Sequence, residues 1–222
     1  MEIIDFLISI PVVLIALTFH ECAHGFVAYK LGDPTARAQG RLSLNPLRHI
    51  DPMGALSMIL FHFGWAKPVP INTRYFKNQK TGMALSALAG PVSNLLLGLL
   101  GCFLYTLSLC LCRNRNVEYE SFKYYLWYSV LLFFFYFAWL NISLAVFNLI
   151  PLPPLDGSRI FMVFLPERAY FKIMRYEREI ALGFFVVLFL DSRWLGGYIT
   201  HGLSYVVNII FDLFMSLFSF II

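Results

Sequence analysis

Residues 81–112 read TGMALSALAGPVSNLLLGLLGCFLYTLSLCLC, and none of these 32 residues carries a formal charge. A second charge-free run of the same length covers residues 124–155. Each run is longer than the ~20 residues that a helix needs to cross ~30 Å of hydrocarbon. The two runs therefore predict membrane-spanning helices and exclude a water-soluble fold.

The composition of the whole chain agrees with this prediction. Of the 222 residues, 59% are hydrophobic and only 14% are charged, whereas a soluble domain has about 25% charged residues. We expect an all-α polytopic membrane protein with about five to six transmembrane or re-entrant helices. It forms a single domain over residues 1–222, with a core at about 1–165 and C-terminal helices at about 166–222. Besides the two charge-free runs, the apolar segments are Ile3–Lys30, Met53–Trp65, Ile180–Leu190 and Trp194–Ile222.

The loop at residues 31–80 is rich in Gly, Pro, Asn and Arg. Its apolar stretch, Met53–Trp65, is too short to cross a bilayer and predicts a re-entrant or interfacial piece. Pro68 and Pro70 stand at alternate positions, which exclude a helix interior and permit an extended edge segment. We therefore expect a small extended or β element in this loop. That segment could pair with an unwound substrate strand or be a solvated interfacial loop.

The basic residues predict the orientation in the membrane. Twelve Lys or Arg residues lie in segments 31–80 and 156–180, against four in the connection after Cys112 and at Arg193. By the positive-inside rule, the two basic segments are cytoplasmic and the N-terminus is outside. We expect a multi-pass protein of a bacterial plasma membrane. Because the net charge of +4 is spread over loops, no nucleic-acid partner is expected.

His20-Glu21-Cys22-Ala23-His24 closes the apolar part of the first span. Positions i and i+4 share one helix face, so His20 and His24 can both present a ring nitrogen to one Zn²⁺. Glu21 is then placed to take a proton from water as a general base. If the helix starts near Ile4, His20 lies about 24 Å along it. This depth predicts one zinc site per chain, below the cytoplasmic surface of the bilayer.

A catalytic zinc needs a third protein ligand. Asp156 follows a proline-rich turn at the cytoplasmic end of the third span, at the level of His20, and is the favoured candidate. An N-cap for the next helix is the alternative role for Asp156. The other candidate ligands are His49, His62, Asp33 and Asp51 in the cytoplasmic loop, and His201, which lies near the opposite face.

These motifs resemble those of the site-2 protease family of intramembrane zinc metalloproteases, in a minimal form without a PDZ or CBS domain. The resemblance covers about residues 15–160, and Asp156-Gly157-Ser158 stands where the family usually has Asp-Gly-Gly. It rests on the zinc motif at residues 20–24 and on the segments at 40–46, 64–70, 89–94 and 148–157.

The resemblance implies a function for individual residues. His20, His24 and Asp156 would be the zinc ligands, and Glu21 the general base. Asn148 and Pro154 match positions near the active site and would be substrate-binding residues. Asn148 would bind the substrate or the oxyanion.

Asn94 would lie near the same site and bind substrate there, or serve helix packing. The expected partners are transmembrane protein or peptide substrates and the lipid bilayer, and the chain could form a homo-oligomer. A membrane metal-binding protein or metal transporter that uses the same residues as an ion relay is the alternative function.

Overall fold

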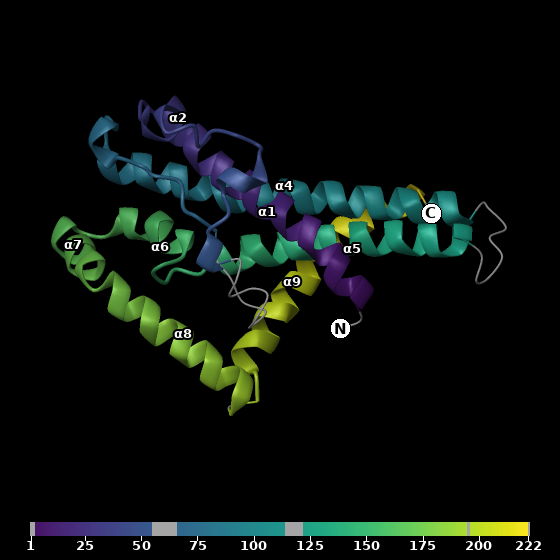
Figure 1. The fold of residues 1–222 in the computed structure, drawn as a ribbon. Coiled ribbons are helices and arrows are strands. Elements are labelled where there is room, and N and C mark those ends of the chain that lie inside the picture. The colour runs from purple at the N-terminus through teal and green to yellow at the C-terminus, as the bar shows by residue number, and fades with distance from the viewer. Residues whose placement is uncertain (1–2, 55–65, 114–121, 195, 222) are drawn as a thin grey trace.

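The computed structural model describes residues 3–54, 66–113, 122–194 and 196–221. Within these residues the secondary structure is helical, which confirms the all-α class (Figure 1). The extended or β element expected in residues 31–80 is not confirmed as a strand, because the described part of that loop has only an isolated antiparallel bridge between Ile50 and Ala66. The helices are α1 (Ile3–Lys30), α2 (Thr35–Ala38), η1 (Pro46–Arg48), η2 (Thr73–Tyr75), α4 (Gln79–Arg113), α5 (Phe122–Asn148), α6 (Asp156–Phe161), η3 (Met162–Phe164), α7 (Glu167–Arg175), α8 (Glu177–Arg193), α9 (Tyr198–Leu217) and η4 (Ser219–Ile221).

Four of the described helices are long and apolar enough to cross a membrane, namely α1, α4, α5 and α9. Helix α8 has 17 residues and begins with Glu177, Arg178 and Glu179, so its uncharged part is too short to span the hydrocarbon. The expected number of about five to six transmembrane or re-entrant helices is therefore not confirmed by the described residues. Residues 55–65 of the expected re-entrant piece lie outside them.

Helices α4 and α5 lie side by side, and α1 crosses them (Figure 1). The close approach of α4 to α5 depends on glycine. A Cβ at Gly98 would lie 2.7 Å from Ile142 Cγ1, and one at Gly101 would lie 2.8 Å from Ala138 Cα. Small residues at such crossings let two backbones pack closely in a membrane, where van der Waals contact holds helices together.

Helix α9 completes the core from the other side. Its Val207 is buried in a cluster with Cys102 of α4 and Ala138 and Ile142 of α5. Helices α8 and α9 form a V that projects to one side of α1, α4 and α5 (Figure 1). The turn of this V is held by Asp191, which is 1% exposed and accepts hydrogen bonds from the backbone N–H groups at the start of α9.

The loop after α1 is fixed by buried charged residues. Asp33 is fully buried and accepts hydrogen bonds from the backbone N–H groups of Thr35 (2.9 Å) and Asn72 (2.7 Å). The buried guanidinium of Arg41 donates to the carbonyl oxygens of Lys67 and Pro68. These bonds hold residues 66–72 against the end of α1 that carries His20 and His24.

The segment after α5 turns sharply before α6. A Cβ at Gly157 would lie 2.3 Å from the carbonyl oxygen of Leu149, so only glycine fits this close return of the chain. An ion pair of 2.5 Å between Arg159 and Glu177 ties α6 to α8. Lys80 at the start of α4 donates to the carbonyl oxygen of Leu165 at 2.9 Å. Asp156, the first residue of α6, is held in this way beside α1 and α4.

Candidate metal centre

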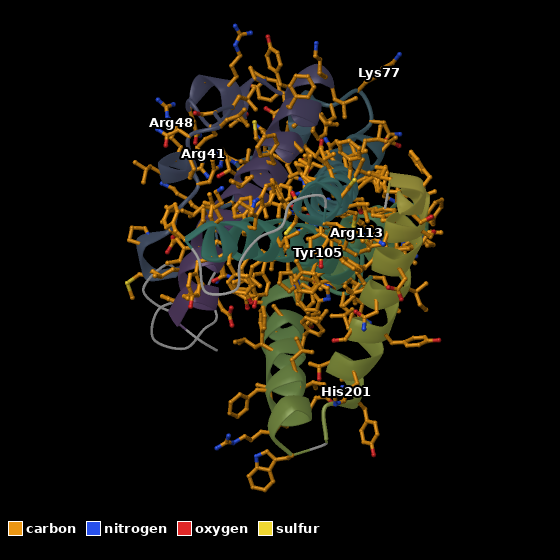
Figure 2. All side chains as sticks on the ribbon, turned by 90° about the vertical axis from the view of Figure 1, so that its right-hand side faces the viewer. Arg41, Arg48, Lys77, Tyr105, Arg113 and His201 are labelled. Carbon is orange, nitrogen blue, oxygen red and sulfur yellow. The ribbon has the colours of Figure 1, made fainter. Side chains whose placement is uncertain are left out.

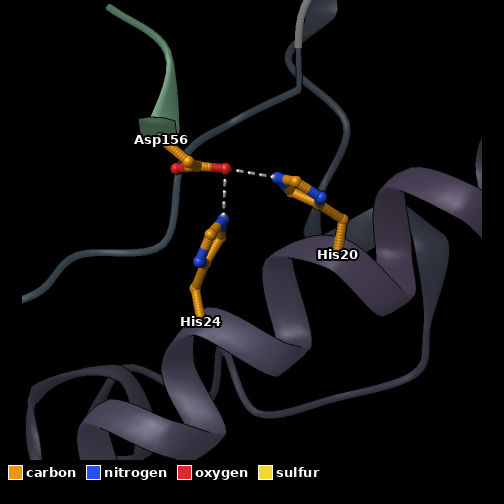
Figure 3. Close-up of side chains that lie close together, drawn as sticks. All are labelled: His20, His24 and Asp156. Atoms are coloured by element: carbon orange, nitrogen blue, oxygen red, sulfur yellow. Dashed lines mark ion pairs between the residues drawn. The ribbon is translucent and has the colours of Figure 1, made fainter. Parts of the chain in front are cut away.

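His20 and His24 lie one helical turn apart on α1, and both are buried, with exposed fractions of 6% and 7%. Their ring centroids are 4.5 Å apart and the ring planes are nearly perpendicular, at 89°. The i, i+4 spacing of the sequence thus brings both imidazoles to one side of the helix. Each ring presents its Nε2 atom to the same point (Figure 3).

Asp156 occupies that point. Its Oδ2 atom lies 3.1 Å from His20 Nε2 and 3.3 Å from His24 Nε2 (Figure 3). One ligand atom from each of the three residues lies within 4.8 Å of the others. The N-cap of α6 is Leu155, so Asp156 does not have the capping role considered as its alternative.

The other ring nitrogens are also engaged. His24 Nδ1 lies 2.8 Å from the carbonyl oxygen of Ser86, and His20 Nδ1 lies 2.5 Å from Asn94 Oδ1. A carbonyl oxygen only accepts, so each Nδ1 carries a proton, and in its neutral form each ring directs the lone pair of Nε2 at Asp156. Three lone-pair atoms then converge in a buried place, an arrangement that a cation stabilises.

Two further observations fit a metal ion. Asp156 Oδ2 is buried and has no hydrogen-bond donor. A carboxyl group that is a metal ligand has to be in its ionised, carboxylate form. Two imidazoles and one carboxylate are a ligand set that zinc uses in catalytic sites.

Helix α4 passes the site at Gly90. A Cβ there would lie 2.4 Å from His24 Cε1 and 2.6 Å from His20 Cε1. The absence of a side chain at this position gives the two rings their space. Gly90 belongs to the segment at residues 89–94, in which the sequence singled out Asn94 but not the glycine.

Glu21 is half-buried and follows the first histidine directly. Its Oε2 atom accepts a 2.9 Å hydrogen bond from the backbone N–H of Val69. The carboxylate of Glu21 thus links α1 to the segment at residues 66–72.

The three remaining predicted site residues lie in different surroundings. Asn94 is fully buried beside His20. Asn148 is half-buried at the end of α5 and donates from Nδ2 to the carbonyl oxygen of Leu144 at 2.9 Å. Pro154 is exposed in the turn that precedes Asp156. Only Asn94 therefore has a hydrogen bond to one of the two histidines.

The other candidate ligands have different partners. Asp33 binds backbone N–H groups of its loop, His49 Nε2 lies 2.7 Å from the carbonyl oxygen of Ser43, and Asp51 accepts from the N–H of Gly54 at 2.9 Å. His201 is exposed on α9, far from the loop cations Arg41, Arg48 and Lys77 (Figure 2). His62 lies outside the described residues.

Sequence reasoning missed Asn141, Ser86 and Val69. Asn141 is fully buried and binds Asn94, whereas Ser86 and Val69 contribute only backbone groups. A backbone donor or acceptor has no signature in a sequence. Asn141 did have a signature in the sequence, because it is an amide side chain inside a run of otherwise apolar residues.

The chain matches the family described as "Peptidase family M50" over residues 8–190. It is 40% identical to the "Putative zinc metalloprotease YwhC" of Bacillus subtilis over 186 residues, which are 84% of this chain and 80% of that protein. It is also similar to proteins of the same description named Rip2, with 29% identity in Mycobacterium tuberculosis and 28% in Mycolicibacterium smegmatis. These matches cover 80% and 68% of this chain, and 64% and 55% of the Rip2 proteins. No solved structure matches the chain.

Proposed function

The chain belongs to peptidase family M50, the site-2 proteases, and we propose that His20, His24 and Asp156 hold its zinc ion while Glu21 is the general base. It is an intramembrane zinc metalloprotease, integral to the membrane through its apolar helices. Of the two functions that the sequence left open, a protease and a metal transporter, the family has the first. The observation that carries the ligand assignment is the convergence of two Nε2 atoms and Asp156 Oδ2.

When bound, zinc acts as a Lewis acid that makes water acidic enough to lose a proton near neutral pH and polarises the scissile carbonyl group. The residues around the site prepare its ligands. Ser86 and Asn94 fix the Nδ1–H tautomer of the two histidines, so that both Nε2 lone pairs face the metal position. Gly90 leaves the rings room to keep that orientation.

Glu21 performs the proton transfers in this proposal. Its carboxylate takes a proton from the attacking water and later gives a proton to the leaving amine, which a peptide bond needs in order to break. The Val69 N–H holds one carboxylate oxygen, Oε2. The other oxygen, Oε1, is then the one assigned to the water.

Asn148, Pro154 and Asn94 have separate roles in the proposal. One amide hydrogen of Asn148 binds the carbonyl oxygen of Leu144, which leaves the second free to donate to substrate or to the oxyanion of the tetrahedral intermediate. Pro154 shapes the substrate-binding turn before Asp156. Asn94 acts on His20 rather than on substrate.

The substrates are transmembrane proteins or peptides, cut within or near their membrane-spanning segments. A transmembrane helix shields its peptide bonds, so the substrate must unwind locally before cleavage. β-Augmentation with residues 66–72 would need free N–H groups on that segment. Those of Lys67, Val69 and Asn72 already bind His49, Glu21 and Asp33, and Pro68 and Pro70 have none. This favours the interfacial-loop alternative for the conformation described.

For the orientation, we propose an outer N-terminus and a site that faces the cytoplasm of a bacterial cell. Lys77 and Arg113 flank opposite ends of α4, which has 35 residues and is therefore about 52 Å long. The loop that carries Arg41, Arg48 and Lys77 is the more basic side (Figure 2). Single cysteines placed at these two positions would test this orientation, after the four native cysteines, Cys22, Cys102, Cys110 and Cys112, have been replaced. A membrane-impermeant reagent should reach position 113 in intact cells and position 77 only after lysis. We also propose that the chain can form a homo-oligomer, which cross-linking in the membrane would test.

The central experiment compares the wild type with Glu21→Gln in a reconstituted cleavage assay while bound zinc is measured in both. We expect equal zinc and a loss of cleavage of about 10²- to 10⁴-fold, the usual contribution of a general base. Retention of cleavage by Glu21→Gln would contradict the general-base assignment. Loss of zinc would instead show that Glu21 acts on the metal site itself.

A further inference from the structure

A chain of buried polar side chains leads from α5 through α4 to the first histidine of α1. Asn141 Oδ1 lies 2.7 Å from Asn94 Nδ2, and Asn94 Oδ1 lies 2.5 Å from His20 Nδ1. Asn141 and Asn94 have no exposed surface, and His20 is 6% exposed. Buried polar groups without partners are costly, and here each amide uses both its nitrogen and its oxygen.

The backbone carbonyl oxygen of Phe137, at one end of this series of hydrogen bonds, fixes the orientation of both side-chain amides. Asn141 Nδ2 lies 2.8 Å from the carbonyl oxygen of Phe137. A carbonyl oxygen can only accept, so the nitrogen of Asn141 must face Phe137 and its oxygen must face Asn94. Asn94 must then turn its nitrogen to Asn141 and its oxygen to His20. The carbonyl oxygen of Ala16, 3.4 Å from Asn94 Nδ2, requires the same orientation.

The direction determines which nitrogen of His20 carries the proton. Asn94 Oδ1 accepts, so His20 Nδ1 donates and His20 Nε2 keeps its lone pair for the metal. If Asn141 did not hold its oxygen toward Asn94, the side-chain amide of Asn94 would lose one of the hydrogen bonds that prevent its rotation by 180°. Its NH₂ group would then face His20 Nδ1 and favour the tautomer whose Nε2 cannot bind zinc.

We propose that Asn141 is a positioning residue of the zinc centre, which sets the tautomer of His20 through Asn94. The inference rests on the proposed ligand set. His24 needs no such relay, because the carbonyl oxygen of Ser86 binds its Nδ1 directly. The two ligand histidines are thus oriented by different means, one by the backbone and one by two amide side chains in series.

The test measures zinc affinity by chelator competition on the full chain in detergent, with thermal stability recorded for every variant. Asn141→Leu removes the polar group and should weaken zinc binding about 10-fold, the lower end of the effect of outer-shell partners. Asn141→Asp should bind more tightly than Asn141→Leu, because a buried neutral carboxyl group can donate to Phe137 and accept from Asn94. The absorption spectrum of bound Co²⁺ should change in Asn141→Leu and resemble the wild type in Asn141→Asp.

Thr106→Val is the matched control. Thr106 is also fully buried in a spanning helix and donates to a carbonyl oxygen one turn earlier, that of Cys102, but it belongs to the α4–α9 contact. It should lower thermal stability and leave zinc affinity unchanged. If Asn141→Leu behaves in the same way, Asn141 is only a packing residue and the inference is wrong.

Two further measurements keep the outcomes distinct. The first is the set of ¹⁵N chemical shifts of the histidine rings in the wild-type apoprotein, assigned with a His20→Gln variant. These shifts should show the Nδ1–H tautomer of His20. The Nε2–H tautomer would overturn the inference, even if Asn141→Leu fails to fold. His20→Ala should lose zinc. If it does and Asn141→Leu does not, the positioning role alone is wrong. If His20→Ala keeps its zinc, the proposed ligand set is wrong.

Discussion

The backbone N–H of Val69 donates a 2.9 Å hydrogen bond to the Oε2 atom of Glu21, 48 residues earlier in the chain. The proposed general base therefore has a second role, because it anchors the loop that lies beside the metal centre. Variants of Glu21 can alter the chemistry, the loop or both, and the choice of replacement decides which is measured.

Glu21→Gln should leave the loop in place, because the amide oxygen can still accept from Val69. Glu21→Ala should release it. Hydrogen exchange of the Val69 amide, followed by mass spectrometry, should be as slow in Glu21→Gln as in the wild type and faster in Glu21→Ala. Equal exchange in all three proteins would show that this bond does not hold the loop.

Asp156→Asn should weaken zinc binding by more than about 100-fold, because it takes away the only negatively charged group among the three proposed ligands. Removal of a residue that only hydrogen-bonds to a ligand costs about 10- to 100-fold. Metal content by mass spectrometry measures this. Asp191→Asn is the matched control, since Asp191 is also a buried carboxylate but holds the start of α9. It should keep its zinc. Asp156→Asn with full zinc would reopen the search for the third ligand.

Gly90→Ala should displace the rings of His20 and His24 and so reduce both zinc affinity and cleavage. Overpacking of this kind typically costs about 1–3 kcal/mol. Gly98→Ala should cost stability at the α4–α5 crossing without an effect on zinc, and Gly183→Ala should be silent, because no atom lies within 4 Å of its added Cβ. Similar zinc affinities for Gly90→Ala and Gly98→Ala would mean that the rings adjust freely.

Asp33→Ala should loosen residues 66–72 without removing zinc. It leaves the N–H groups of Thr35 and Asn72, both half-buried residues, without their acceptor, and a lost acceptor costs up to about 1–3 kcal/mol for a buried donor. We expect a lower melting temperature, faster amide exchange at Asn72 and reduced cleavage, with zinc content unchanged. Unchanged exchange at Asn72 would contradict this role.

The membrane fold could be predicted from the sequence where charge is absent over long runs. Helices α1, α4 and α5 follow from such runs, since only a helix satisfies its own backbone in hydrocarbon. The C-terminal part was less predictable. Residues 180–190 are apolar, but the first three residues of α8 are charged and limit the uncharged part of this helix. An apolar run alone does not say whether the helix crosses the membrane.

The group of proposed metal ligands could be predicted because ionisable side chains stand out in an apolar sequence. His20, Glu21 and His24 are costly at membrane depth without a function, and Asp156 lies at the same level after the proline-rich turn. The partners of these groups were not predictable. Ser86 and Val69 act through backbone atoms that every residue has, and a single asparagine such as Asn141 is typical of ordinary helix packing.

The proposed zinc ligands come from two distant parts of the chain, His20 and His24 on α1 and Asp156 after α5. A ribosome that has made the first span has therefore supplied only two of the three ligands. The third emerges after α4 and α5 have been synthesised and has to return to the level of α1. The nascent chain thus has no complete metal site while its first helices enter the membrane, and by this proposal it cannot cleave peptide bonds until α6 has been made.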